Sequence, residues 1–335
     1  MEKKMRICGM IFLLTAAAIL ANTNISEGGK VKIDKIAYFN QPNCYRLSNG
    51  TVEVIATSDI GPRVIAYRFI GGENILAELG KGAVVKTDLG DWHPWGGHRL
   101  WHAPESIPRS YVPDNAPIKV EEVGSNAIRL IQPVEAPTGI RKEILLKLAD
   151  EGTKVTLIHK LTNEGIWPVE LAPWALTIVA GGGTTIIPQE PFIPHEKELL
   201  PARPMVLWHY TDLSDSRWKF LKKYICLRTD ENLRYPQKIG VLNKQGWAAY
   251  LRKDLLFVKK FPFVEGAAYP DMGCNCETYT DGAFMEVETL GPMVKLNPGA
   301  STEHIEEWFL FDGIKAEFTD ASLDEVLKPI VEKCK

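Results

Sequence analysis

The chain has 335 residues, of which 45% are hydrophobic and 24% are charged, and its formal net charge at pH 7 is −3. This composition is typical of a globular protein that buries a large core, and the near balance of charge argues against a nucleic-acid partner. No Ser/Gly linker, charge block or short repeat divides the sequence, so we expect residues 24–335 to form a single domain.

The N-terminus has the pattern of a secretory signal. Lys3, Lys4 and Arg6 precede an apolar run over residues 7–21, and the polar Asn22-Thr23-Asn24 follows. The run is short for a membrane span and has the order of a cleaved signal. We therefore expect a signal peptide over residues 1–23, a secreted or periplasmic protein and no integral membrane domain after cleavage. An uncleaved anchor is the alternative.

Cysteine usage gives no obvious disulfide framework. Cleavage would leave five cysteines, an odd number, so at least one would be unpaired or bridged to another molecule. They are Cys44, Cys226, Cys274, Cys276 and Cys334.

Most of the remaining sequence predicts β-strands. Alternating or β-branched segments are separated by hairpin-scale turns, as in Asp59-Ile60-Gly61-Pro62 and Asp150-Glu151-Gly152. The expected strands cover residues 51–57, 63–70, 118–123, 127–132, 140–148, 153–161, 168–179, 184–187, 206–210, 238–242, 247–251, 255–260, 283–290 and 303–311. One helix is expected over residues 322–333, with Ser322 and Glu325 as a capping box. This pattern predicts an all-β sandwich of large antiparallel sheets with a short C-terminal helix and a concave outer face.

The segment Trp92–Glu105 is unusual in composition. It contains three of the seven histidines and three of the nine tryptophans, together with Pro94 and the pair Gly96-Gly97. Pro and Gly-Gly disfavour a helix or a central strand, so we expect a surface loop. Trp faces suit a sugar ring, and imidazole and guanidinium groups suit its hydroxyls. This loop is therefore predicted to be one wall of a carbohydrate site. The candidate residues in it are Trp95, His98, Arg99, Trp101, His102 and Glu105.

A second candidate wall lies near the C-terminus. Residues 284–290 alternate, which places Glu286 and Glu288 on one strand face about 6.6 Å apart. In a partly desolvated groove, burial and mutual repulsion would raise the pKa of at least one carboxyl and create a base. An ordinary solvated strand face is the alternative.

The segment just before this strand is predicted to be a polar loop over residues 269–279. Asp271, Asn275 and Glu277 are candidates for binding hydroxyls, or they stabilise the turn. The aromatic residues of Trp208-His209-Tyr210 have two interpretations, one wall of the groove or buried strand residues, and the second is favoured.

No cofactor or metal is expected. The histidines His93, His98 and His102 have spacings of five and four residues with glycines between, which match no familiar zinc pattern.

Several short motifs together resemble the galactose mutarotase (aldose 1-epimerase) superfamily. In the C-terminal half these are Met285–Pro292, the Asn297-Pro298-Gly299 turn and His304–Trp308. In the N-terminal half they are Gly61–Ile65, Gly71–Leu76 and Gly96-Gly97. Gly96–Glu105, Pro173–Thr177 and Gly181–Gly183 are most similar to an uncharacterised branch of that superfamily, a domain of unknown function.

The resemblance implies a β-supersandwich that binds a sugar in a groove. In such mutarotases a Glu takes the proton of the anomeric hydroxyl while a His protonates the ring oxygen, and Glu288 matches the Glu by position. Where they place that His this chain has Pro173-Trp174, which leaves His98 or His102 as the expected acid. Arg63 and Trp174 join the expected sugar-binding surface.

Three functions remain open from the sequence. The first is an exported epimerase-like enzyme that acts on a sugar by Glu/His acid–base catalysis, and the second is a non-catalytic carbohydrate-binding protein. The third is a glycan hydrolase or lyase that uses Glu286 and Glu288, although two carboxylates on one strand flank a glycosidic bond poorly.

Overall fold

The computed structural model describes residues 31–82 and 84–334 of the chain. The predicted signal peptide, residues 1–23, lies outside the described residues. Within the described part, no helix has the length and apolar character needed to cross a membrane.

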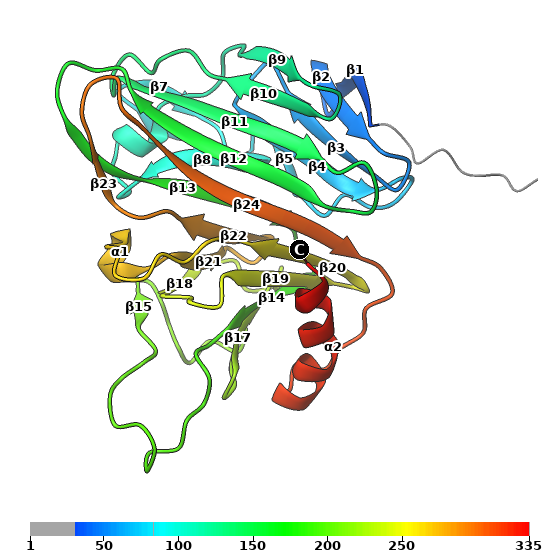
Figure 1. The fold of residues 1–335 in the computed structure, drawn as a ribbon, viewed down its shortest axis with the longest axis vertical. Coiled ribbons are helices and arrows are strands. Elements are labelled where there is room, and N and C mark those ends of the chain that lie inside the picture. The colour runs from blue at the N-terminus through cyan, green and yellow to red at the C-terminus, as the bar shows by residue number, and fades with distance from the viewer. Residues whose placement is uncertain (1–30, 83, 335) are drawn as a thin grey trace, which may run out of the picture.

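Two large antiparallel sheets dominate the fold (Figure 1). The first sheet has the spatial order β1 (Lys32–Tyr38), β2 (Gln41–Ser48), β3 (Val52–Thr57), β4 (Arg63–Phe69), β8 (Trp95–Ala103), β13 (Val169–Ala180), β22 (Phe284–Leu290), β21 (Cys276–Thr280), β18 (Gln237–Val241) and β15 (Met205–Leu207). Two short strands join it at the side, β5 (Glu78–Gly80) on β8 and β23 (Val294–Leu296) on β13.

The second sheet completes the sandwich. Its order is β16 (Trp218–Phe220), β17 (Tyr224–Arg228), β14 (Gly183–Pro188), β19 (Trp247–Arg252), β20 (Leu255–Lys260), β24 (Ser301–Phe311), β12 (Val155–Asn163), β11 (Ile140–Leu148), β10 (Ala127–Ile131) and β9 (Lys119–Val123). The long strand β24 crosses the middle of the molecule, with β12 on one side and β20 on the other (Figure 1). The remaining elements are the ribbon β6 (Val85–Thr87) and β7 (Gly90–Trp92), the 3-10 turn η1 (Arg109–Tyr111) and the short α1 (Pro270–Gly273).

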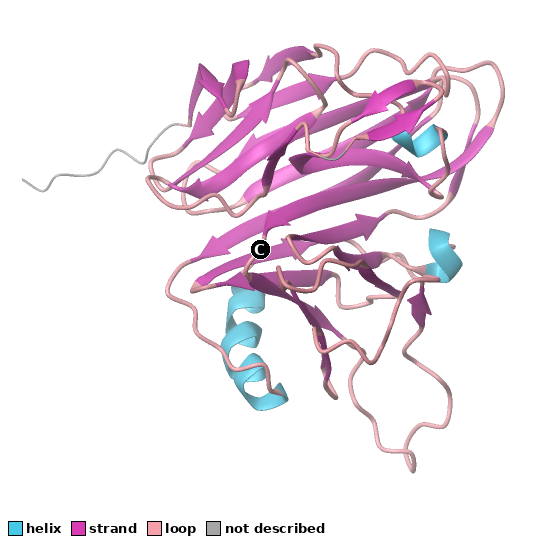
Figure 2. Ribbon diagram, turned by 180° about the vertical axis from the view of Figure 1, so that it is seen from behind, coloured by secondary structure: helices cyan, strands magenta, loops and turns pink. Residues whose placement is uncertain are grey.

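Strand alternation builds the core between the sheets. Val54 of the first sheet and Leu146 and Leu157 of the second are fully buried in one cluster, together with Val287 and Trp308. The predicted all-β sandwich is therefore confirmed, and Figure 2 shows from behind how little helix accompanies the strands. The first sheet presents its other face outward, where the site described below lies.

The C-terminal helix α2 (Asp320–Lys333) packs on the outer face of the second sheet, where Leu323 and Leu327 are buried. Its N-cap is Thr319, whose hydroxyl accepts a hydrogen bond from the backbone N–H of Ser322. The predicted capping box at Ser322 is therefore wrong, because the Ser322 hydroxyl instead accepts from the backbone N–H of Glu317 at 3.0 Å.

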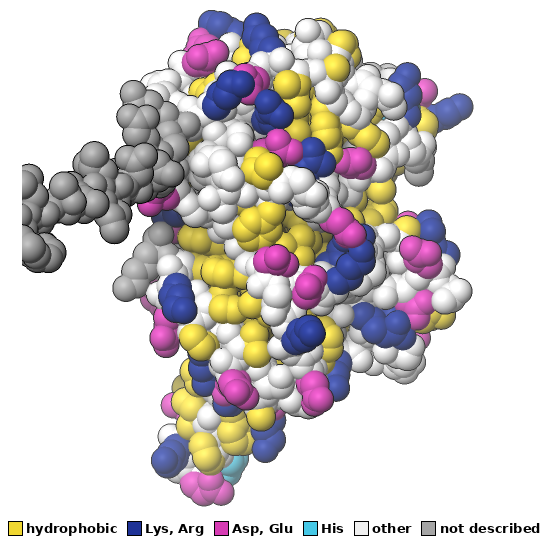
Figure 3. Space-filling model, turned by 90° about the vertical axis from the view of Figure 1, so that its right-hand side faces the viewer, with side chains coloured by type: hydrophobic (Ala, Val, Ile, Leu, Met, Phe, Trp, Pro, Cys, Tyr) yellow, Lys and Arg dark blue, Asp and Glu magenta, His cyan; other side chains and the backbone are white. Residues whose placement is uncertain are grey.

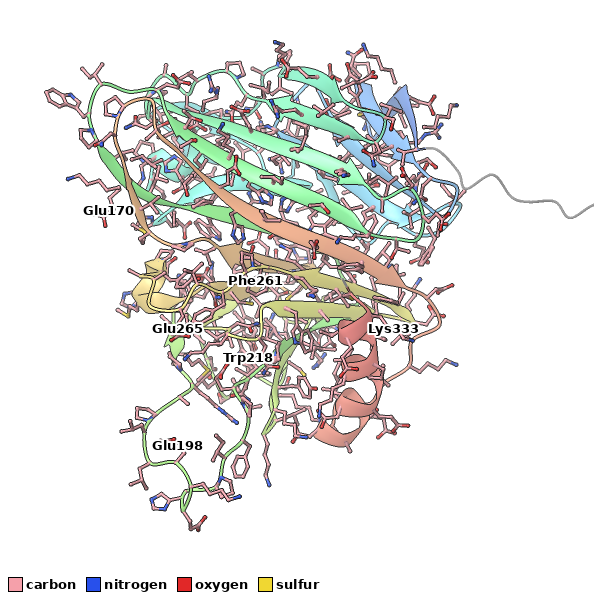
Figure 4. The ribbon with its side chains drawn as sticks, viewed as in Figure 1. Glu170, Glu198, Trp218, Phe261, Glu265 and Lys333 are labelled. Atoms are coloured by element: carbon pink, nitrogen blue, oxygen red, sulfur yellow. The ribbon has the colours of Figure 1, made fainter. Side chains whose placement is uncertain are left out.

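A long segment between β14 and β15 projects from the body and carries exposed apolar side chains, namely Phe192, Ile193, Leu199 and Leu200. Figure 3 shows hydrophobic side chains on this projection, and Figure 4 labels Glu198 within it.

The segment Trp92–Glu105 is not the predicted loop. Most of it forms β8, a fully buried strand that pairs with β13 along most of its length and with β4 at Arg99 and His98. The irregularity is confined to its start, where Trp95, Gly96 and Gly97 have φ values of 55°, 90° and 66°. A Cβ on Gly97 would lie 2.2 Å from the backbone oxygen of Val64, so the glycine permits a close approach between two backbones.

Candidate functional site

A groove of about 610 Å³ opens on the outer face of the first sheet. Side chains that point away from the sandwich core form its floor, and they come from five adjacent strands. They include Arg99 and Trp101 of β8, Trp174 and Leu176 of β13, Glu286 of β22, Tyr279 of β21 and Lys238 of β18. The segments before β8 and around β15 add Trp92, Trp208 and Tyr210 to the walls.

Aromatic rings make up a large part of the groove lining. The ring centres of Trp101 and Trp174 are 5.3 Å apart, and those of Trp101 and Trp92 are 5.4 Å apart. The guanidinium carbon of Arg99 lies 4.6 Å from the Trp101 ring centre and 5.3 Å from that of Trp92. Cation–π contacts of this geometry fix the guanidinium within the aromatic wall.

A buried cluster of charged groups surrounds Lys238 at the floor of the groove. Glu277 and Glu288 are direct cross-strand neighbours, and such a pair of like charges is unfavourable without compensation. Lys238 supplies it, with its Nζ 2.8 Å from Glu277 Oε2 and 3.0 Å from Glu288 Oε2. The indole N–H of Trp174 donates to the same Glu288 oxygen at 2.8 Å. Lys238 also lies 4.9 Å and 4.7 Å from the ring centres of Trp174 and Trp208.

These contacts move the pKa values of the cluster away from their ordinary ranges. Burial would lower the pKa of Lys238, but the carboxylates of Glu277 and Glu288 outweigh it and raise that pKa well above 10.5. Burial, reinforced by the charge of Glu288, raises the pKa of Glu277 well above 4.5 even beside Lys238. One cation thus balances one carboxylate, and the pair of carboxyls favours retention of one proton.

Glu286 has the pKa best suited to proton transfer near neutral pH. Burial raises the pKa of Glu286 to about 7, and the charge of Glu288 adds to this against the opposing effect of Arg99. The Arg99 Nη2 atom is 3.4 Å from Glu286 Oε1, and Glu286, which lines the groove, is 8% exposed. A group with this pKa can both accept and donate a proton under physiological conditions.

The elevated pKa of Glu286 predicts a pH-dependent effect of Glu286→Gln on stability. The pKa of this carboxyl is 4.5 in the unfolded chain and about 7 in the folded protein, so the folded protein holds the proton more tightly. The resulting contribution to the free energy of unfolding is fully present below pH 4.5 and is lost as the pH rises through 7. Between pH 5 and pH 8, the free energy of unfolding of the wild type should therefore fall relative to Glu286→Gln by on the order of 3 kcal/mol. Urea denaturation of both proteins at each pH measures this difference, and a constant difference would contradict the elevated pKa.

Several predicted site residues do line or adjoin this groove. Arg99, Trp101, Trp174, Glu105 and Glu286 line it directly. Glu288 and Glu277 lie fully buried at its floor, linked to the groove through Lys238. Asp271 is half-buried beside them, and its charge contributes to the raised pKa of Glu277.

Three other predicted residues do not line the groove and make structural hydrogen bonds instead. Arg63 is fully buried and donates to the carbonyls of Pro94 and Gly96 at 2.9 and 2.8 Å, with an ion pair to Asp114 at 2.7 Å. Trp95 donates its indole N–H to Asn115. Asn275 bonds to the backbone of Asn243 through both its amide nitrogen and its oxygen.

The structure does not bring His98 and His102 to the groove. Alternation along β8 places them on the face opposite Arg99 and Trp101, between the two sheets. Burial lowers the pKa of both imidazoles, well below 6.5 for His98. The expectation that one of them protonates a sugar from the groove wall therefore does not fit their placement.

His98 instead belongs to a buried hydrogen-bond network. His159 Nδ1 lies 3.0 Å from the carbonyl oxygen of His304, so this nitrogen carries the proton and Nε2 is an acceptor. His98 Nε2, 2.6 Å away, must then be the donor, and its Nδ1 accepts from the hydroxyl of Thr177 at 2.8 Å. Both rings are neutral in this arrangement, in agreement with the lowered pKa values of both.

The same network contains the one group of described residues with metal-like spacing. Ligand atoms of His98, His159 and Glu306 lie within 4.8 Å of one another. However, Glu306 already pairs with Lys259 at 2.9 Å and accepts from the indole of Trp308 at 2.9 Å. Because a cation would have to displace the ammonium of Lys259, this donor set fits a structural network, and we assign it no metal.

Sequence reasoning gave Lys238 and Tyr279 no role in the groove, and it favoured a buried position for Trp208. The strand containing Lys238 was expected, but alternation alone does not tell which of its faces meets the groove. Trp208 and Tyr210 were expected to be buried strand residues, and this is wrong, since Trp208 is half-buried and Tyr210 is 42% exposed in the groove wall.

Comparison with solved structures connects this architecture to known proteins. A putative mutarotase (YeaD) from Salmonella typhimurium superimposes with a TM-score of 0.52 at 11% identity, covering 84% of this chain and 94% of that one. A galactose mutarotase-like protein from Lactobacillus casei gives 0.51 at 10% identity, covering 80% and 100%. The chain has the galactose mutarotase-like fold. The predicted superfamily resemblance is thus confirmed for the fold.

One further solved structure is similar to this chain over only part of its own length. A TPR-domain containing protein from Parabacteroides distasonis also matches, with a TM-score of 0.53 at 13% identity over 83% of this chain. The present chain covers 49% of that protein's length, so its mutarotase-like fold corresponds to about half of that protein. No family model matches the sequence, and no curated protein does.

Proposed function

We propose that the groove on the first sheet binds a carbohydrate. The observation that carries this proposal is the combination of tryptophans in edge-to-face contact with buried carboxyl, ammonium and guanidinium groups in one groove of a mutarotase-like fold. Aromatic faces pack on the apolar faces of sugar rings, and the charged groups bond hydroxyls. The volume of about 610 Å³ is typical of a small-molecule site.

Unsatisfied polar atoms support a hydroxylated ligand. Among the described residues, the Nε and Nη1 atoms of Arg99 and Oε1 of Glu288 are buried without a hydrogen-bond partner. Buried polar groups are costly without partners, and sugar hydroxyls can donate to the carboxylate and accept from the guanidinium.

The finer proposal is acid–base action on the anomeric centre. Glu288 would take the proton from the anomeric hydroxyl, and the protonated form of Glu286 would give one to the ring oxygen, so that the ring opens and recloses. Both sugar oxygens are attached to one carbon, so two carboxyls on the same strand can reach them from one side. A glycosidic bond needs carboxyls on opposite sides, which argues for isomerisation over hydrolysis.

A non-catalytic binding protein is the second candidate. Its support is the burial of Glu288, which is 0% exposed and already bonded to Lys238 and Trp174. Polarimetry on freshly dissolved single anomers separates the two functions. Acceleration that Glu288→Gln abolishes supports the enzyme, whereas binding without acceleration supports the second candidate.

Sugar binding itself should depend on Trp208. Removing this half-buried ring in Trp208→Ala should weaken affinity by about 10- to 100-fold, because a stacking surface above Lys238 is lost. Titration calorimetry measures this effect. The matched control is Trp167→Ala, which removes an indole that is 75% exposed and outside the groove. Equal affinities of the two variants would contradict the proposed site.

We also propose that the protein is exported, with residues 1–23 as its signal peptide. The five described cysteines are free and buried, so the folded chain presents no accessible thiol within the described residues to an oxidising compartment. The N-terminal sequence of protein recovered from outside the cytoplasm tests this. A mature N-terminus near residue 22 or 24 is expected, and an intact leader would contradict cleavage.

A further inference from the structure

The cations of the groove are all committed to carboxylates of the groove itself. Arg99 pairs with Glu286 at 3.4 Å, and Arg234 pairs with Asp281 at 3.4 Å. Lys238 is shared between Glu277 and Glu288. Each lysine and arginine that lines the groove among the described residues therefore already has a carboxylate partner, although Nε and Nη1 of Arg99 keep hydrogen-bonding capacity for a ligand oxygen.

Carboxyl groups outnumber these cations. The carboxyls at or directly beneath the groove are Glu105, Asp271, Glu277, Asp281, Glu286 and Glu288. Glu105 and Asp271 have no lysine or arginine ion-pair partner within 4 Å among the described residues, and one ammonium serves two carboxyls at Lys238. The groove therefore has an excess of acidic groups over basic ones.

Some carboxyl groups of the groove keep their protons, which reduces the negative charge that the few cations do not balance. Burial together with neighbouring carboxylates raises the pKa of Glu286 to about 7 and also raises the pKa of Asp271. A ligand ammonium in the groove would stabilise the ionised carboxylates and release protons, whereas a ligand carboxylate or phosphate would add to the repulsion.

From this balance of charges we propose that the groove takes an amino sugar with a free ammonium group, which Glu286 and the neighbouring carboxylates recognise. The inference rests on the proposed carbohydrate function and narrows it to a class of ligand. It disfavours uronic acids and sugar phosphates, because the groove has more carboxyl groups than cations and each cation already has a carboxylate partner.

Calorimetric titration with matched sugars tests this proposal. Glucosamine and glucose differ only in an ammonium in place of a hydroxyl, as do galactosamine and galactose, and glucuronate carries the opposite charge. At pH 7 at least one amino sugar should bind 10-fold or more tightly than its neutral counterpart, and glucuronate should bind more weakly than glucose. Titration in two buffers of different ionisation enthalpy should reveal proton release on binding of the amino sugar.

Variants assign the effect to the groove. Glu286→Gln should reduce the preference for the amino sugar to less than 3-fold, whereas Glu303→Gln, on an exposed position of β24, should leave it unchanged. Equal binding of neutral and amino sugars, or tighter binding of glucuronate, overturns the ammonium preference and leaves the carbohydrate groove standing. Failure of every one of these sugars to bind overturns both proposals.

Discussion

Replacing Lys259 with methionine should lower the free energy of unfolding by about 3–5 kcal/mol. Lys259 is fully buried between the sheets, with Nζ 2.9 Å from Glu306 Oε1 and 2.8 Å from the carbonyl oxygen of Val287. The neutral side chain would leave the buried carboxylate of Glu306 without its cation. The neighbouring His98 and His159 offer little replacement charge, because burial lowers the pKa of both.

Chemical denaturation at pH 7.5 measures this loss. Lys295→Met is the control, because Lys295 lies exposed on β23, and it should change stability by less than about 0.5 kcal/mol. The double variant Lys259→Met/Glu306→Gln should recover a large part of the loss, since it removes the unpaired charge. A single variant as stable as the control would contradict a charged pair in the core.

Replacing Lys238 with methionine should lower the free energy of unfolding by a similar amount, and the size of this loss should depend on pH. Lys238 is the only described cation within 4 Å of Glu277 and Glu288, so its removal at pH 8 should cost about 3–5 kcal/mol. At pH 5 the cost should be smaller, because burial raises the pKa of Glu277 and a proton on this carboxyl can then replace part of the missing positive charge. The variant should also bind sugar poorly, since the floor of the groove loses its fixed charge arrangement.

Chemical denaturation of the wild type and Lys238→Met at pH 5 and at pH 8 gives the difference in free energy of unfolding between the two proteins at each pH. Comparing the proteins at the same pH cancels the titration of groups that the substitution leaves untouched. Lys238→Arg retains a cation and should keep more stability than Lys238→Met at pH 8. An identical loss at pH 5 and pH 8 would contradict the proton-linked carboxyl cluster.

Strand periodicity predicted the acidic strand well. The alternation of residues 284–290 correctly placed Glu286 and Glu288 on the face opposite Met285 and Val287, which lie in the core. Here one face is apolar, so the sequence reports directly which way each side chain points.

The prediction of a loop around Gly96-Gly97 was wrong because glycine occurs both in loops and in strands where two backbones approach closely. These glycines were taken as signs of a loop, whereas they allow β8 to approach the backbones of Val64 and Ala77 closely. A loop has no fixed alternation, so the opposite orientations of His98 and Arg99 could not be foreseen. Strand β8 carries polar residues on both faces, so its sequence lacks the alternation of apolar and polar residues that reveals a buried face. His98 can be buried because it forms hydrogen bonds with residues far away in the sequence, His159 and Thr177.

The central claim is that a sugar binds on the outer face of the first sheet, above Lys238 and beside Glu286. A crystal structure of the protein with a sugar that binds in solution tests it most directly. The sugar ring should lie against Trp101 and Trp208, with a polar group of the ligand within hydrogen-bond distance of Glu286. A sugar bound on any other surface, with this groove empty, would contradict the account.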